Sequence, residues 1–264
     1  MLVISLTFDW QAVEQAVKKP LYMLASLVLV FGSMAFIGWG LGRLFFGDSL
    51  LFAGQVLVGL LPTDVSAPLL VLLARGNVAL AAVLNALVTG ISPFLVPPFF
   101  LWLTGIPLEV PVLRLIFELA LIILVPMILG VSLRSRYPDV LAKYDDVFSG
   151  MSGILYLLLL LAVVTGSATT LLSLGKLALL LTLAQLTLNL SGYALASMVF
   201  PWIRNRGDRV AFLFTVSKKE FSIAAAVVMA SGLPEAVVIP AVFYAVIQMI
   251  TSPLVTKMVN RLWS

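Results

Sequence analysis

The sequence lacks cysteine and histidine altogether across its 264 residues. A chain without cysteine forms no disulfide and offers no thiolate nucleophile. It also lacks the cysteine and histidine ligands on which zinc sites and most haem sites depend. Disulfide-stabilised domains, cysteine enzymes and the common zinc and haem sites are therefore excluded.

Charged residues are scarce as well. They make up 11% of the chain, whereas about a quarter of a soluble domain is charged. Hydrophobic residues make up 62%, and the mean hydropathy is +1.15. A water-soluble fold of this size has too little interior to bury so much apolar surface. The apolar runs are about 20 residues long, which fits spanning helices and not barrel strands of about 10 residues. The composition predicts an all-α polytopic membrane protein.

Eight apolar spans can be read between short joints that are rich in glycine and proline. No joint is long enough for a separate soluble domain, so residues 1–264 are expected to form one transmembrane domain. The spans cover 21–45, 50–75, 78–103, 112–133, 147–165, 174–200, 210–231 and 235–258.

The basic residues gather on one side of the membrane. When the joints are assigned alternately to the two sides, eleven lysines and arginines fall on one side and three on the other. Because cytoplasmic loops carry the excess of Lys and Arg, both ends of this chain are predicted to be cytoplasmic, in a plasma or inner membrane. The net charge of +4 thus reports topology and indicates no nucleic-acid partner.

Two stretches resemble each other, PTDVSAPLLVLLARG at 62–76 and KKEFSIAAAVVMASG at 218–232. Laid together without gaps, they place Asp64 opposite Glu220, so that both intramembrane acids fall at the same position. The stretches lie five spans apart, an odd number, and so cross the membrane in opposite directions. This pattern predicts an inverted repeat, the usual architecture of a secondary transporter.

The first of these stretches is predicted to interrupt its helix. A charge at mid-membrane costs roughly 2.5–3.5 kcal/mol on insertion scales, so Asp64 must face protein or water. Pro62 and Pro68 flank it, and a proline inside a helix removes a backbone donor and clashes with the preceding turn. The span should therefore break at 62–68, which leaves free backbone groups that bind ions and polar substrates.

The second stretch carries Lys218, Lys219 and Glu220 in the middle of a span but has no central proline. A break there would depend on these charges and on Ser217 or Ser222. The plainer alternative is that all these charges pair with one another and only fix helix packing. Two polar centres in mirrored positions are more than packing requires, which favours a binding site.

The other polar residues within spans have ordinary structural interpretations. Glu118 is spaced to pair with Arg114 one helical turn away. Asn85, Gln185 and Asn189 either bond to neighbouring helices, the commoner role, or face a cavity.

Four stretches carry a resemblance to a known family. They are LLPTDVSAPLLVLLARGNVALAAVLNALVTGISPFLVPP (60–98), ILVPMILGVSLRSRYP (123–138), LTLNLSGYALA (186–196) and VSKKEFSIAAAVVMASG (216–232). Through them the chain resembles the bile acid:sodium symporter family over nearly its whole length. The resemblance implies a ten-helix fold of two inverted five-helix repeats, whose fourth and ninth helices are broken and cross at mid-membrane.

On that plan, residues 1–103 are the remainder of the first repeat and 104–264 form the second. The resemblance also implies that the first helix and most of the second are missing from this chain, with the N-terminal residues leading into the third.

The chain departs from the family at the positions that bind sodium. Few of the oxygen ligands that a hard cation prefers remain there. The matched positions are Ala67, Pro68, Ala81, Asn85, Ser217 and Phe221. Lys218 and Lys219 lie close by, and we expect their ammonium groups to take the place of bound sodium and to attract an organic anion.

The sequence therefore predicts a secondary active transporter that moves a small organic anion across the bilayer by alternating access. It predicts no enzyme, because HExxH and GxSxG motifs are absent. The alternatives are a proton-coupled carrier that uses the buried carboxylates, an uncoupled anion carrier, and a channel or structural membrane subunit. No cofactor is expected beyond Na⁺ or H⁺ as coupling ion. The predicted binding residues are Pro62, Thr63, Asp64, Ser66, Asn85, Ser217, Lys218, Lys219, Glu220 and Ser222.

Overall fold

A computed structural model describes residue 6 and residues 19–106, 110–166 and 175–262. Every regular element within these ranges is a helix. In chain order they are α3 (Pro20–Leu27), η1 (Val28–Ser33), α4 (Met34–Phe46), α5 (Leu50–Leu60), α6 (Ala67–Leu73), α7 (Val78–Thr104), α8 (Val112–Arg136), α9 (Pro138–Leu141), η2 (Ala142–Tyr144), α10 (Asp145–Gly166), α12 (Lys176–Met198), η3 (Phe200–Trp202), α13 (Arg206–Ser217), α14 (Phe221–Ser231), η4 (Glu235–Val238) and α15 (Ile239–Leu262).

The eight predicted spans each correspond to a helix or a helix pair. Elements α3, η1 and α4 form one continuous helix, and α5–α6 and α13–α14 are two interrupted spans. In the described ranges, five helices are long and apolar enough to cross a membrane without interruption. The prediction of an all-α polytopic membrane protein is confirmed.

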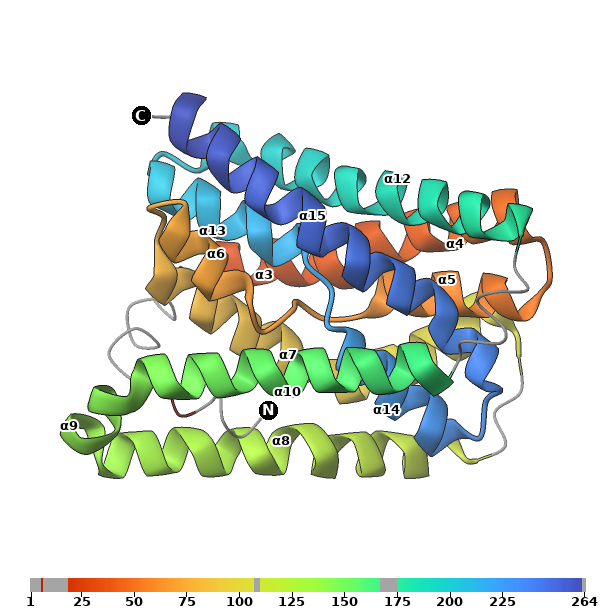
Figure 1. Cartoon of the computed structure of the whole chain (residues 1–264), viewed down its shortest axis with the longest axis horizontal. Coiled ribbons are helices and arrows are strands. Elements are labelled where there is room, and N and C mark those ends of the chain that lie inside the picture. Colours follow the sequence, from red (N-terminus) through yellow and green to blue (C-terminus); the bar gives the residue numbers. More distant parts are fainter. Residues whose placement is uncertain (1–5, 7–18, 107–109, 167–174, 263–264) are drawn as a thin grey trace.

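The helices run roughly along one direction in two groups (Figure 1). In this view α8 and α10 run along one edge, and α12, α4 and α15 lie toward the opposite one. The interrupted spans α5–α6 and α13–α14 lie between these edges. Much of α8 is apolar and exposed, as at Leu113, Phe117 and Ile128, which suits a lipid-facing surface.

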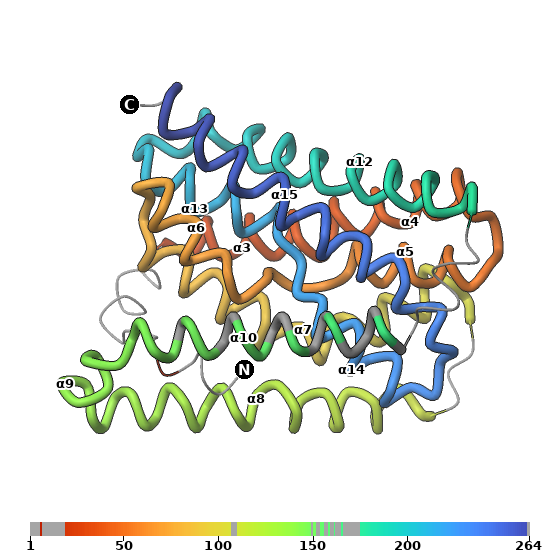
Figure 2. Tube along the Cα trace, viewed as in Figure 1, coloured from red at the N-terminus to blue at the C-terminus, as the bar shows by residue number. Residues whose placement is uncertain are grey.

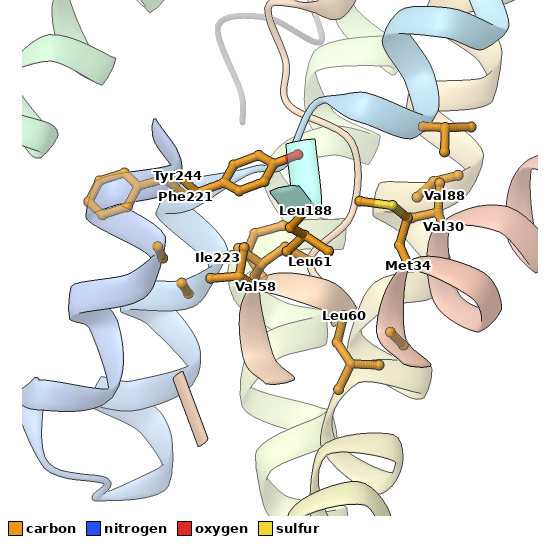
Figure 3. Packing of buried hydrophobic residues seen from close by; sticks show 14 of the residues in the cluster. Val30, Met34, Val58, Leu60, Leu61, Val88, Leu188, Phe221, Ile223 and Tyr244 are labelled. Atoms are coloured by element: carbon orange, nitrogen blue, oxygen red, sulfur yellow. The ribbon is translucent and has the colours of Figure 1, made fainter. Parts of the chain in front are cut away.

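The buried core surrounds the interrupted helices. Figure 3 shows apolar side chains from several spans gathered there, including Met34, Val58, Leu188 and Ile223. Helices α4 and α5 approach so closely that a Cβ added to Gly38 would lie 2.9 Å from the Gly59 Cα. Small residues allow this approach, which is a common means of helix association in membranes.

One end of the bundle is tied together by polar contacts between joints. Asp208 is buried and binds both Lys19, at 2.6 Å, and the Asn77 side chain, at 2.7 Å. Arg206 donates to the Arg75 carbonyl at 3.0 Å. The sequence assigned Lys19, Arg75 and Arg206 to one membrane side, and they meet at one end here. That this end is cytoplasmic stays a prediction.

Gly54 should tolerate no side chain. A Cβ there would lie 2.4 Å from the Val237 carbonyl oxygen and 2.7 Å from the Pro240 ring. Since overpacking a well-packed site typically costs about 1–3 kcal/mol, we expect Gly54→Ala to lower the melting temperature of the purified protein by several degrees. Gly40→Ala is the matched control, because nothing lies within 4 Å of its added Cβ. Equal melting temperatures for the two variants would contradict this packing.

Candidate functional site

Two interrupted helices cross in the middle of the molecule. The chain leaves α5 at Leu60 and begins α6 at Ala67, while α13 ends at Ser217 and α14 begins at Phe221. The two non-helical connections pass each other near the centre of Figure 2. They are joined where the Glu220 N–H donates to the Pro62 carbonyl at 2.9 Å.

Both predicted breaks are present, for different reasons. The first covers residues 61–66, close to the predicted 62–68. Pro62 lies within it, whereas Pro68 lies in the first turn of α6, where a proline is tolerated. The second break has no proline. Its backbone is extended at Lys218, with φ −97° and ψ 136°.

Each acid accepts hydrogen bonds from a serine two residues further along, but only Glu220 is the N-cap of the helix that follows, whereas α6 has Ser66 as its N-cap. The Asp64 carboxylate accepts from the N–H of Ser66 at 2.7 Å and from its hydroxyl. The Glu220 carboxylate accepts in the same way from Ser222, at 3.3 Å and 2.5 Å. Its other oxygen accepts from the Val65 N–H at 2.9 Å and so ties α14 to the first break. A carboxylate at this position satisfies free N–H groups and the positive end of the helix dipole.

The helices that precede the breaks are capped at their carbonyl ends, but by different groups. At the end of α5, the Lys219 Nζ donates to the carbonyls of Gly59 at 2.9 Å and Leu61 at 2.8 Å, and it also donates to the Val30 carbonyl of η1 at 3.3 Å. At the end of α13 the donors are uncharged. The Thr63 hydroxyl donates to the Thr215 carbonyl at 2.7 Å.

The Ser217 carbonyl also receives uncharged donors, the Tyr244 hydroxyl at 2.6 Å and the Asn189 amide at 3.0 Å. Figure 3 shows the Tyr244 hydroxyl oxygen pointing in toward the centre of the view. The Ser217 hydroxyl bonds within its own helix to Leu213, so this predicted site residue contributes its carbonyl and not its side chain.

The two lysines have different surroundings although both are buried. Lys219 has an acceptor for each of its three N–H groups. The Lys218 Nζ lies 3.9 Å from the Asp64 carboxylate, beyond hydrogen-bond distance. It has no hydrogen-bond partner among the residues that the structure describes. Only Lys218 therefore has donors left for a bound molecule.

Amide side chains hold the crossover in place. The Gln248 amide donates to the second Asp64 oxygen at 3.1 Å and exchanges hydrogen bonds with the backbone N–H and carbonyl of Lys219. Asn85 donates to the Asp64 carbonyl at 2.9 Å.

The sequence left Asn85, Gln185 and Asn189 either bonding to neighbouring helices or facing a cavity. Gln185 donates to Gln55 of α5 and Asn189 to the end of α13, whereas Asn85 donates to the first break. Sequence reasoning missed Gln248 and Tyr244, although a glutamine inside a span was a signal.

The positions matched to the family's sodium ligands offer little to a metal ion. Ala67 and Ala81 are fully buried apolar side chains. In the described ranges no three Asp, Glu, His or Cys residues gather as metal ligands would. The predicted binding residues do come together at the crossover, with Asn85 beside them, so the structure brings the whole predicted set to one place.

The predicted pair of Glu118 and Arg114 is formed, with 2.7 Å between the carboxylate and Nε. It lies within α8, outside the two helix breaks.

Comparison with known proteins agrees with this architecture. The chain is 27% identical to the uncharacterized protein YbaS of Bacillus subtilis (strain 168), over 97% of this chain and 85% of that protein. It is 28% identical to the probable sodium/metabolite cotransporter BASS1, chloroplastic, of Oryza sativa subsp. japonica. That second alignment covers 51% of this chain and 33% of the rice protein.

A family match covers nearly the whole chain, from residue 6 to residue 261. The resemblance read from the sequence is thereby confirmed at the level of the family. The chain belongs to the SBF-like CPA transporter family.

Proposed function

We propose that this transporter is a secondary carrier that moves a small organic anion by alternating access, with the crossover of 61–66 and 218–220 as its binding site. The observation that carries the proposal is the reciprocal pairing of two interrupted helices around four buried charges. Interrupted helices that cross at mid-depth are a recurrent site architecture in secondary transporters. Such a site can be opened to either side by movement of the surrounding helices.

The contacts at the two halves support an inverted repeat. In the alignment of 62–76 with 218–232, Asp64 matches Glu220, and each accepts a hydrogen bond from the N–H of the serine two residues further along. Thr63 matches Lys219, and each side chain donates to the carbonyl end of the opposite preceding helix. We infer that residues 1–103 and 104–264 are the two repeat portions.

The free hydrogen-bonding capacity of the crossover favours an anion. Both carboxylates already accept several hydrogen bonds, so they offer little to a cationic substrate. The Lys218 ammonium retains its donors. The Thr215 hydroxyl is also buried without a hydrogen-bond partner in the described part of the chain. Donors that are left over in a buried site call for an acceptor, such as a carboxylate group.

The sodium/metabolite cotransport named for the rice relative supports the transport of a small metabolite. We do not extend sodium coupling to this chain, because three of the six positions matched to sodium ligands are Ala67, Pro68 and Ala81, whose side chains offer no oxygen. We therefore propose anion transport that does not depend on the sodium ligands of that family.

Alternating access predicts that the crossover is reached from both sides of the membrane, though not at once. The chain has no native cysteine, so a single Val65→Cys substitution can report this directly. We expect a membrane-impermeant maleimide to label Val65→Cys from outside in intact cells and from the cytoplasmic face in inside-out vesicles. Val56→Cys, in the closed core, should be labelled from neither side.

Labelling of Val65→Cys from one side only would contradict alternating access. A large ionic conductance through vesicles that contain the protein would favour a channel instead.

A further inference from the structure

We propose that the carbonyl end of α5 is a monovalent-cation site, and that the ammonium group of Lys219 fills it as a cation tethered to the chain. That this tethered cation makes sodium unnecessary for anion transport rests on the function proposed above. The site itself rests on contacts that are independent of any substrate.

The geometry around Lys219 is that of a cation bound by carbonyl oxygens. Three backbone carbonyls, of Val30, Gly59 and Leu61, lie 2.8–3.3 Å from its Nζ. The residue is 1% exposed, and no carboxylate in the described ranges lies within 4 Å of its Nζ. Three acceptors match the three N–H donors of an ammonium group. Carbonyl oxygens gathered in this way are also the ligands that replace the hydration shell of alkali ions in membrane proteins.

The three carbonyls come from two places where the regular α-helical hydrogen bonding is interrupted. Gly59 and Leu61 lie at the end of α5, where the last carbonyls have no partner within the helix and the helix dipole is negative. Val30 lies in η1, a π-helical stretch that displaces the hydrogen-bond ladder of its helix. Negative partial charges from two helices therefore converge on one buried point.

The matched end of α13 shows that capping alone does not require a charge. The Thr215 and Ser217 carbonyls, which align with Gly59 and Leu61, receive uncharged hydroxyl and amide donors. A threonine, a tyrosine and an asparagine suffice there. The α5 end instead receives a full positive charge, although burying an ammonium group is costly. This difference indicates that a cation, and not merely a donor, is required at the α5 end.

The proposal implies that removing the ammonium creates a vacancy for a dissolved cation. Lys219→Ala deletes three methylene groups and the amine, which together have the shape of n-propylammonium. The purified full chain of Lys219→Ala should melt roughly 10 °C below the wild type, since three buried carbonyls lose their partner. Addition of n-propylammonium chloride should restore about half of this loss in a saturable manner, because a ligand that binds only the folded state raises its stability.

Matched controls separate a cation site from general effects. Choline chloride at the same ionic strength and 1-propanol at the same concentration should not restore Lys219→Ala. Thr63→Ala removes the aligned, uncharged cap, and its melting temperature should not respond to n-propylammonium. Rescue by 1-propanol as well as by n-propylammonium would overturn the proposal. A Lys219→Ala protein that is as stable as the wild type would also overturn it. So would one that aggregates equally in n-propylammonium chloride and in choline chloride.

The wild type provides a test that needs no variant. With its site already filled, its melting temperature should be the same in sodium chloride and choline chloride, and a saturable rise specific to sodium would overturn the proposal. If n-propylammonium restores the melting temperature of Lys219→Ala but the wild type transports no anion, the cation site is supported and the proposed function is refuted. If the wild type transports an anion but n-propylammonium does not restore Lys219→Ala, the proposed function is supported and the cation site is refuted.

Discussion

Lys218→Met should abolish anion transport while the protein remains at least as stable as the wild type. The Lys218 side chain is buried, yet its Nζ lies 3.9 Å from Asp64 and makes no hydrogen bond within the described part of the chain. Burying an ammonium group that makes no hydrogen bond is costly, and an apolar side chain of similar length removes that cost. In Lys218→Met the Asp64 carboxylate still accepts hydrogen bonds from Ser66 and Gln248, so it is not left without partners.

The functional loss should be large because the substrate would lose its charged partner in a buried site. Truncating one member of such a pair typically costs about 2–5 kcal/mol, or roughly 30-fold to more than 1,000-fold in affinity. The measurement is uptake by reconstituted vesicles, with the melting temperature of each preparation as the check on folding. Lys218→Arg, which keeps the charge, should retain part of the activity. Unchanged uptake by Lys218→Met would remove Lys218 from the site.

Glu220→Ala should be strongly destabilising and inactive. The carboxylate accepts from the backbone of Val65 and from the backbone and hydroxyl of Ser222, so it links α14 to the opposite break. Hydrogen bonds to a charged group contribute about 1.5–3 kcal/mol each, although they are not additive. We expect a loss on the order of 3–5 kcal/mol, or roughly 10 °C in melting temperature.

Asp48→Ala is the matched control for Glu220→Ala. Asp48 pairs with Arg43 at an exposed joint, where a salt bridge contributes about 0–1 kcal/mol. Its melting temperature should therefore stay close to that of the wild type. If both variants lost the same stability, the link between α14 and the first break would not be holding the crossover together.

The sequence was a good guide to the spans and to the first break. The spans follow from hydrophobic length, which is a local property. The break before α6 carries a proline, Pro62, beside a mid-membrane charge. The break before α14 has no such marker. Its backbone is held open by contacts with a distant segment, including the bond from Glu220 to the Pro62 carbonyl.

The separate roles of the two lysines could not be read from the sequence for a geometric reason. Consecutive side chains in an extended segment point to opposite sides. Lys218 therefore faces Asp64, while Lys219 faces the end of α5. If Lys218 and Lys219 were consecutive residues of a helix, their side chains would lie on neighbouring parts of the same helix surface. We predicted from the sequence that both lysines attract the substrate, and we now propose this role for Lys218 alone.

Backbone partners were also invisible in the sequence. The three acceptors of Lys219 are carbonyls, which any residue type would supply at those positions. Residue matching indicated that few sodium ligands remain, but not where an internal cation would lie. Gln248 and Tyr244 were missed because their contacts join α15 to the crossover across a long stretch of chain.

We propose that a buried lysine at the crossover, Lys218, selects an organic anion. The most direct test is the transport current or uptake of purified protein in sodium-free proteoliposomes. The solutes would be a panel of monocarboxylates, 2-oxo acids, dicarboxylates and bulky organic anions, with amines and sugars of similar size as comparisons. We expect saturable transport of at least one organic anion without sodium, and loss of that transport in Lys218→Met. Transport confined to cations or neutral solutes, or anion transport that Lys218→Met leaves intact, would contradict this proposal.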